Sequence, residues 1–138
     1  MANYNLYNGI NTNEIKTKAK DLKDQVDRAK GNLSSFESSL SDSIWKASSK
    51  DTLKKAFKTL NEDVTKEITD ALNTAITVAG YIDDYNEAKK NAEDYISKLK
   101  SADSEKDAAS IPGWESALAE AEANMDTAES NVNTALQG

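Results

Sequence analysis

Apolar residues recur at alternating steps of four and three in the first part of this chain. The series runs Ile15, Ala19, Leu22, Val26, Ala29, Leu33, Phe36 and Leu40. Such steps keep one narrow stripe of side chains on a single side of an α-helix, as in helices that pair in coiled-coil fashion. The pattern predicts a helix of about thirty residues that begins after a cap at Asn11 or Thr12.

A second and longer apolar series follows a break in this pattern. Its members are Leu53, Phe57, Leu60, Val64, Ile68, Ala71, Ala75, Val78, Ile82, Tyr85, Ala92, Ile96 and Leu99. The series predicts a helix from about Lys50 to about Lys100, with Ser48 and Asp51 forming a start similar to a capping box. Gly80 leaves open a break in this helix, which would give a compact four-helix bundle instead of a long rod.

A third apolar series begins after a connecting loop at 101–111. Pro112 is suited to a first helical turn, and the positions that follow are Trp114, Leu118, Ala121, Met125, Ala128, Val132 and Ala135. They predict a third helix over 112–136. The second helix would be on the order of 75 Å long and the first about 45 Å, so the first cannot cover the second. We expect the third helix to pack antiparallel on the part that remains.

The expected fold is therefore all-α. Residues 12–101 would form an elongated antiparallel helical hairpin with its turn at 43–49, and residues 102–138 would add an acidic loop and the third helix within the same domain. Residues 1–11 are polar and rich in asparagine, with a turn signal at Asn8-Gly9. This segment is expected to be a flexible arm that stays loose unless it docks.

The composition excludes most catalytic chemistry. The chain has no cysteine and no histidine, so disulfides, thiol catalysis, histidine acid–base catalysis and zinc sites built on these residues cannot occur. No phosphate-binding glycine loop, EF-hand loop or nucleophile elbow can be located. Acidic side chains along solvent-facing helix positions are more often a solvated surface than a carboxylate pair. We expect a protein that is not an enzyme and has no cofactor or metal ion.

The net charge of −7 is concentrated in the last segment. Residues 102–138 carry one basic and eight acidic groups, whereas residues 1–101 carry 16 of each. This chain lacks the basic surface that nucleic acids and anionic membranes require, so neither is an expected partner. The acidic segment is either a solubilising surface or a docking surface for a basic partner. No stretch is apolar enough to be a secretory signal or to insert into a membrane.

The predicted turn carries the one family resemblance in the chain. A helix of about thirty residues, a turn containing Trp-x-Gly and a second helix make up the WXG-type proteins, the early-secretory-antigen-like substrates of bacterial type VII secretion. Residues 13–100 resemble this unit, with Trp45-Lys46-Ala47 in place of Trp-x-Gly. Leu53 occupies an apolar position where the family often has an aromatic residue.

The chain also departs from that family. Ala47 stands where the family has glycine, and no tyrosine is followed four residues later by Asp or Glu, which is the family's export signal. The third helix lies outside the basic unit, so the chain is also similar to the longer helical proteins associated with LXG toxins of Gram-positive bacteria. Those proteins bind the helical amino-terminal domain of the toxin.

The resemblance implies a type VII secretion substrate or targeting partner that acts through helix–helix contacts. Its partner would be a second copy or a related helical protein, including an LXG-type toxin. It would be secreted without a cleavable signal peptide, and cytoplasmic before export. The alternative is a cytosolic coiled-coil adaptor or chaperone-like protein, in which Trp45 only closes the end of the hairpin.

Two sets of residues are the candidate sites. The turn motif consists of Trp45, Ala47 and Leu53. The residues expected in helix packing or in a partner interface are Ile15, Leu22, Val26, Leu33, Phe36, Leu40, Phe57, Leu60, Val64, Ile68, Ile82, Tyr85, Trp114, Leu118, Met125 and Val132.

Overall fold

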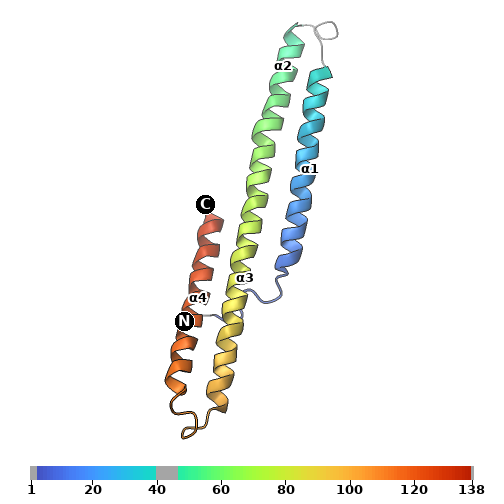
Figure 1. Cartoon of the computed structure of the whole chain (residues 1–138). Coiled ribbons are helices and arrows are strands. Elements are labelled where there is room, and N and C mark those ends of the chain that lie inside the picture. Colours follow the sequence, from blue (N-terminus) through green and yellow to red (C-terminus); the bar gives the residue numbers. More distant parts are fainter. Residues whose placement is uncertain (1–2, 40–46, 138) are drawn as a thin grey trace. The chain divides into compact units, whose positions relative to one another are not determined.

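The computed structural model describes residues 3–39 and 47–137 of the 138-residue chain. In these ranges every regular element is helical and no strand occurs, which confirms the predicted all-α fold (Figure 1). Trp45 and Leu40 lie outside the described residues. The helices divide between two compact units, and α3 (Thr65–Ser101) contributes residues to both.

The hairpin unit spans Glu14–Ile76 and contains two antiparallel helical segments. The first helical segment is α1 (Thr12–Ser39). The second helical segment consists of α2 (Ala47–Lys58), the π-helical turn η1 (Thr59–Val64) and the start of α3. Their antiparallel direction follows from two hydrogen bonds. Lys23 Nζ donates to Asn73 Oδ1 at 2.6 Å, and Asn61 Nδ2 donates to Ser34 Oγ at 3.0 Å.

The start of the second helical segment differs slightly from the prediction. Helix α2 begins at Ala47 rather than near Lys50, so the last three residues of the turn expected at 43–49 are helical. Helix α1 matches its predicted length and start. The break that Gly80 left open does not occur, because α3 continues through this residue. A methyl group added at Gly80 would meet nothing within 4 Å.

The π turn was not predicted from the sequence. In η1 the Thr65 backbone N–H donates to the carbonyl of Leu60, five residues back, instead of four as in an α-helix. The Thr65 hydroxyl donates to the carbonyl of Asn61. A π turn takes one more residue than an α-turn, so it changes which side chains of α2 face α1.

The extra residue keeps apolar side chains between the two helical segments of the hairpin. In an unbroken α-helix, Phe57 would lie about 80° around the helix from the buried Thr65, and Lys58 would take its place opposite α1. With one residue absorbed, the Phe57 side chain remains within about 20° of Thr65. Phe57 then packs against Phe36, with ring centroids 5.3 Å apart.

The arm unit consists of residues 1–13 and 77–138. In it α3 packs antiparallel against α4 (Ile111–Gln137), as predicted for the third helix, with a loop at 102–110 between them. The core of this unit is an alanine-rich cluster in which every side chain is buried. Its members are Tyr85, Ala88, Ala92, Ala121, Met125 and Ala128.

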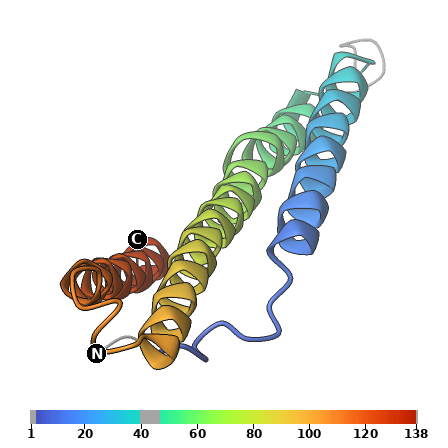
Figure 2. The ribbon, with the colours of Figure 1, turned by 60° about the horizontal axis from the view of Figure 1, so that its bottom comes forward.

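The amino-terminal arm is docked on this core rather than loose. Tyr4 and Tyr7 pack against the cluster, and the Tyr7 and Tyr85 rings meet edge to face with centroids 4.8 Å apart. Figures 1 and 2 show the arm running from the start of α1 to α3 and crossing it. Gly9 has a φ of 81°, which only glycine adopts without strain, so the Asn8-Gly9 turn is confirmed.

Polar contacts fix the end of the arm. Lys89 Nζ donates to Asn8 Oδ1 at 3.0 Å, and the hydroxyl of the buried Thr12 donates to Asp83. The arm therefore completes the core of its unit, because its two tyrosines cover apolar surface that α3 and α4 would otherwise expose.

Candidate functional site

A line of large apolar side chains remains exposed on the second helical segment of the hairpin unit. Leu60, Val64 and Ile68 have exposed fractions of 41%, 39% and 44%. They follow one another at steps of four, so they lie on one side of η1 and α3. We call these three residues the exposed stripe.

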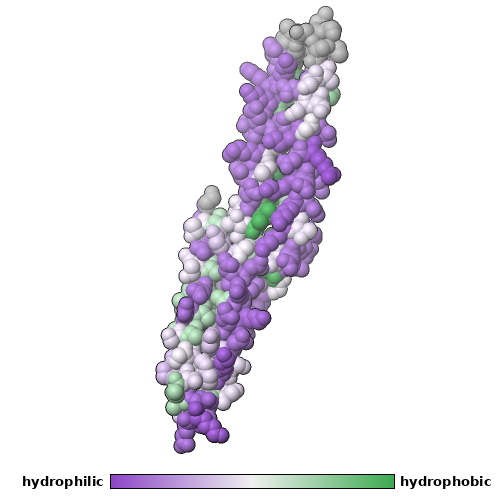
Figure 3. Space-filling model, in the orientation of Figure 1, coloured by the Kyte–Doolittle hydropathy of each residue, from purple (hydrophilic) through white to green (hydrophobic). Residues whose placement is uncertain are grey.

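The stripe continues in both directions through small or uncharged residues. Thr52 and Ala56 precede it at steps of four, Ala71 follows Ile68 by three residues, and all three are exposed. The charged residues of this second helical segment lie at other positions around the helix. Hydrophilic residues cover most of the face of the hairpin unit that is visible in Figure 3. An uncharged lane at helical spacing is the kind of surface to which an amphipathic helix binds.

Helix α1 adds two exposed apolar side chains to the hairpin unit. Leu22 and Phe36 have exposed fractions of 47% and 49%. They lie on nearly the same side of α1, because fourteen residues make about four helical turns. Phe36 contacts Phe57, which stands three residues before Leu60 and is its neighbour on the helix surface. Phe36 therefore lies at the border of the exposed stripe.

The structure separates the sequence-predicted interface residues into three groups. Buried in the arm unit are Ile82, Tyr85, Met125 and Val132. Half-buried in one unit or the other are Ile15, Val26, Leu33, Leu53, Phe57, Trp114 and Leu118. Exposed, all in the hairpin unit, are Leu22, Phe36, Leu60, Val64 and Ile68. The side chain of Ala47, with Trp45 and Leu40, lies outside what the structure describes.

Several residues that shape these surfaces do not belong to the predicted set. Asn61 and the buried Thr65 face α1 from positions that the apolar series assigned to the surface. Tyr4 and Tyr7 are the other omission. Two aromatic residues three positions apart in a polar segment were the available signal that the arm docks.

The tyrosines of the arm unit have perturbed proton affinities. Burial, together with the nearby carboxylate of Glu122, raises the pKa of the Tyr4 hydroxyl to about 12. Burial and the carboxylate of Glu129 also raise the pKa of Tyr7. Burial raises the pKa of Tyr85, although the backbone of Leu6 acts in the opposite direction. These hydroxyls stay protonated in the folded protein at neutral pH.

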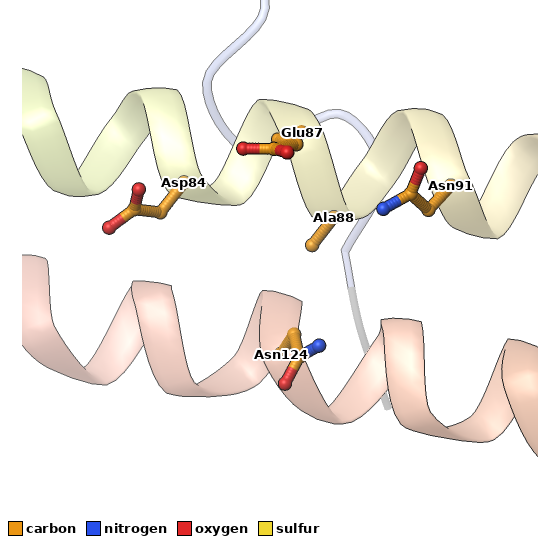
Figure 4. Close-up of a pocket in the computed structure, with 5 residues that line it drawn as sticks. All are labelled: Asp84, Glu87, Ala88, Asn91 and Asn124. Atoms are coloured by element: carbon orange, nitrogen blue, oxygen red, sulfur yellow. The ribbon is translucent and has the colours of Figure 1, made fainter.

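A polar hollow of about 260 Å³ lies between α3 and α4 in the arm unit. Asp84, Glu87 and Asn91 line it from α3, on either side of Ala88, and Asn124 lines it from α4 (Figure 4). Only two of these side chains are acidic. Within residues 3–39 and 47–137, no group of three His, Cys, Asp or Glu side chains is placed to hold a metal ion.

No protein-family model, curated protein or solved structure matches this chain. Among the described residues, none of the helices is long and apolar enough to cross a membrane. The candidate site that the geometry identifies is the exposed stripe, because its three large apolar side chains lie uncovered on one side of the helix.

Proposed function

We propose that this chain is a non-enzymatic type VII secretion substrate or targeting partner that acts through helix–helix contacts. The observation that carries the proposal is the exposed stripe on a two-helix unit. Leu60, Val64 and Ile68 are regularly spaced, and they remain exposed although α1 packs against the same helices; no other segment in the described part of the hairpin unit covers them. Burying such side chains contributes roughly 1.5–3 kcal/mol each, so a partner that covers them gains appreciable affinity.

The partner is a helical protein, either a second copy of this chain or a related one such as an LXG-type toxin. An amphipathic helix fits because the uncharged lane from Thr52 to Ala71 repeats at helical spacing and offers no buried polar group to satisfy. The chain would be exported without a cleavable signal peptide and would be cytoplasmic before export. The helical hairpin and the Trp45-Lys46-Ala47 sequence support this assignment.

Size-exclusion chromatography with light scattering tests the interaction. The parent protein should form a complex with itself or with a type VII component at micromolar concentration. Ile68→Lys should weaken that complex at least about tenfold, because a charge would be buried against the partner. Glu67→Lys places the same side chain at the adjacent exposed position, about 100° around the helix, and should leave the complex intact.

Export is tested separately in a bacterium with a type VII system. The protein should reach the culture supernatant only when the secretion ATPase is active. A protein that stays inside the cell but still pairs through the stripe would instead be a cytosolic coiled-coil adaptor. A strict monomer at high concentration that also binds no type VII component would contradict the proposal.

A further inference from the structure

The second helical segment of the hairpin unit contains a rare local structure at the exposed stripe. The π turn η1 spans Thr59–Val64, and it includes Leu60 and Val64 of the stripe. π turns form well under 1% of residues in globular proteins and are frequent at functional sites. The turn at this place therefore requires a physical reason.

The π turn satisfies its polar groups incompletely. Asn61 donates through Nδ2 to Ser34, and its backbone carbonyl accepts from the Thr65 hydroxyl. Its side-chain oxygen Oδ1 is buried, and no residue of the described part of the chain donates to it. A buried acceptor without a donor disfavours the conformation that buries it.

The same residues fit an unbroken α-helix in a different register. Leu53 and Val64 are eleven residues apart and Phe57 and Val64 are seven apart, so in an α-helix each pair lies within about 20° on one side. Leu53 and Phe57 would then extend the exposed stripe toward the start of α2. Lys54 and Lys58 would face α1 in their place, because they stand eleven and seven residues before Thr65.

We infer that residues 59–64 are a register switch between these two arrangements. In the π register, which the structure shows, Leu53 and Phe57 pack toward α1 and the stripe is short. In the α register, Leu53 and Phe57 join Leu60, Val64 and Ile68 in one longer stripe. This explains why the sequence follows one helical apolar series through a region where the structure does not.

The two registers have opposing advantages. The π register packs Phe57 against Phe36 and keeps Lys58 exposed and Lys54 half-buried at the edge of α1, but it leaves Asn61 Oδ1 without a donor. The α register releases Asn61 and restores regular hydrogen bonds, but it turns Lys54 and Lys58 toward α1. A helical partner that covers the stripe favours the α register, because it then buries two more apolar side chains.

This inference rests on the proposed function only for the role of the partner. The switch itself is a property of the isolated chain, and it can be measured without any partner. The chain has two phenylalanines, Phe36 and Phe57. Protein labelled only at phenylalanine therefore gives one inter-ring nuclear Overhauser effect (NOE), which is present in the π register and absent in the α register.

The experiment removes the charges that oppose the α register. In Lys54→Leu/Lys58→Leu the α register places two leucines against α1, so the inter-ring NOE should be lost while the circular dichroism spectrum stays helical. Lys55→Leu/Lys66→Leu removes the same charge from positions that face α1 in neither register. This control should keep the NOE.

A deletion separates a change of register from misfolding. Removing Asp63 from Lys54→Leu/Lys58→Leu takes out the extra residue, which allows a regular α-helix to hold Phe57 against Phe36. The NOE should therefore return. If Lys54→Leu/Lys58→Leu keeps the NOE, or if the deletion fails to restore it, the register switch is wrong.

The partner's effect is measured last, with the parent protein across the concentrations at which light scattering detects association. The NOE should weaken as the complex forms. An NOE unchanged in a formed complex would overturn the partner's role in the switch. If no complex forms, the proposed function fails, while the result with the lysine variants still decides whether the two registers exist.

Discussion

The two units of this protein use antiparallel helices to opposite effect. Among the side chains whose burial the structure describes, nine of the ten buried apolar ones belong to the arm unit, and the tenth, Ala19, belongs to the hairpin unit. The arm unit has a third segment, the amino-terminal arm, lying on its two helices. In the described part of the hairpin unit no third segment exists. Two helices bury only the line between them, and a third element is what turns that line into a core.

The sizes of the side chains follow the same division. Alanines on α3 and α4 allow the helices of the arm unit to approach closely, so that Tyr85 and Met125 become fully buried. The hairpin unit carries five large apolar side chains with exposed fractions between 39% and 49%, and in the arm unit Leu6, Ile10 and Leu136 are exposed. A small core can thus be complete, while a surface rich in large apolar residues remains open to a partner.

The largest expected difference between the units is in the cost of removing one side chain. Tyr85→Ala should lower the free energy of unfolding by about 3–5 kcal/mol, because it empties a fully enclosed site. Ile68→Ala in the dilute monomer should cost less than about 1 kcal/mol, because that side chain is already exposed. Denaturant unfolding followed by circular dichroism measures both. Equal costs would mean that the hairpin unit is as well packed as the arm unit.

An intermediate effect is expected from alkaline pH, and only in the arm unit. An unfolded chain ionises its tyrosines near pH 10, whereas Tyr4 in the folded protein resists ionisation until about pH 12. Its contribution to stability is complete below pH 10 and is lost as the pH rises from 10 to 12. The pKa values of Tyr7 and Tyr85 are raised too, so they act in the same direction.

Tyr4→Phe isolates the contribution of one hydroxyl to this pH dependence. The variant should lose less stability than the parent between pH 10 and 12, as measured by denaturant unfolding at each pH. Tyr81→Phe is a matched control on α3, because Tyr81 is half-buried and lies outside the arm cluster. Identical pH profiles for the parent and Tyr4→Phe would show that the arm is not docked.

The smallest expected effect comes from glycines inside the helices. Gly80→Ala in the arm unit and Gly31→Ala in the hairpin unit should each raise the free energy of unfolding by about 0.5–1 kcal/mol. An added methyl group meets nothing within 4 Å at either position. The gains should be similar, because they depend on the backbone and not on how well each unit is packed. A loss at Gly80 would contradict a continuous α3.

The sequence predicted the helices well because their apolar steps and their ends are local signals. The line of Ala121, Met125 and Val132 is buried on α4 as its uniform steps indicated. The π turn could not be predicted, because Leu60, Val64 and Ile68 fit a regular helical series as well. Whether Leu53 and Phe57 or Lys54 and Lys58 face α1 depends on the free energy needed to turn the two lysines toward α1. That cost arises only once α1 packs against α2.

The arm escaped prediction for a different reason. Tyr4 and Tyr7 belong to no periodic series, and their binding site is formed by α3 and α4, which lie far away in the sequence. The secretion assignment rests on the short motif around Trp45 and stays a prediction, since Trp45 lies outside the described residues. The exposed stripe, by contrast, became recognisable only from the structure.

The docking of the arm also constrains the order in which the protein folds. The bond from Lys89 to Asn8 joins residues 81 positions apart, and the bond from Thr12 to Asp83 joins residues 71 apart. During synthesis the arm leaves the ribosome before the helices that bind it have been made. Contacts between distant parts of a chain form slowly, so the arm unit should be the last part to complete. The hairpin, whose partners are closer in sequence, can form while α4 is still being translated.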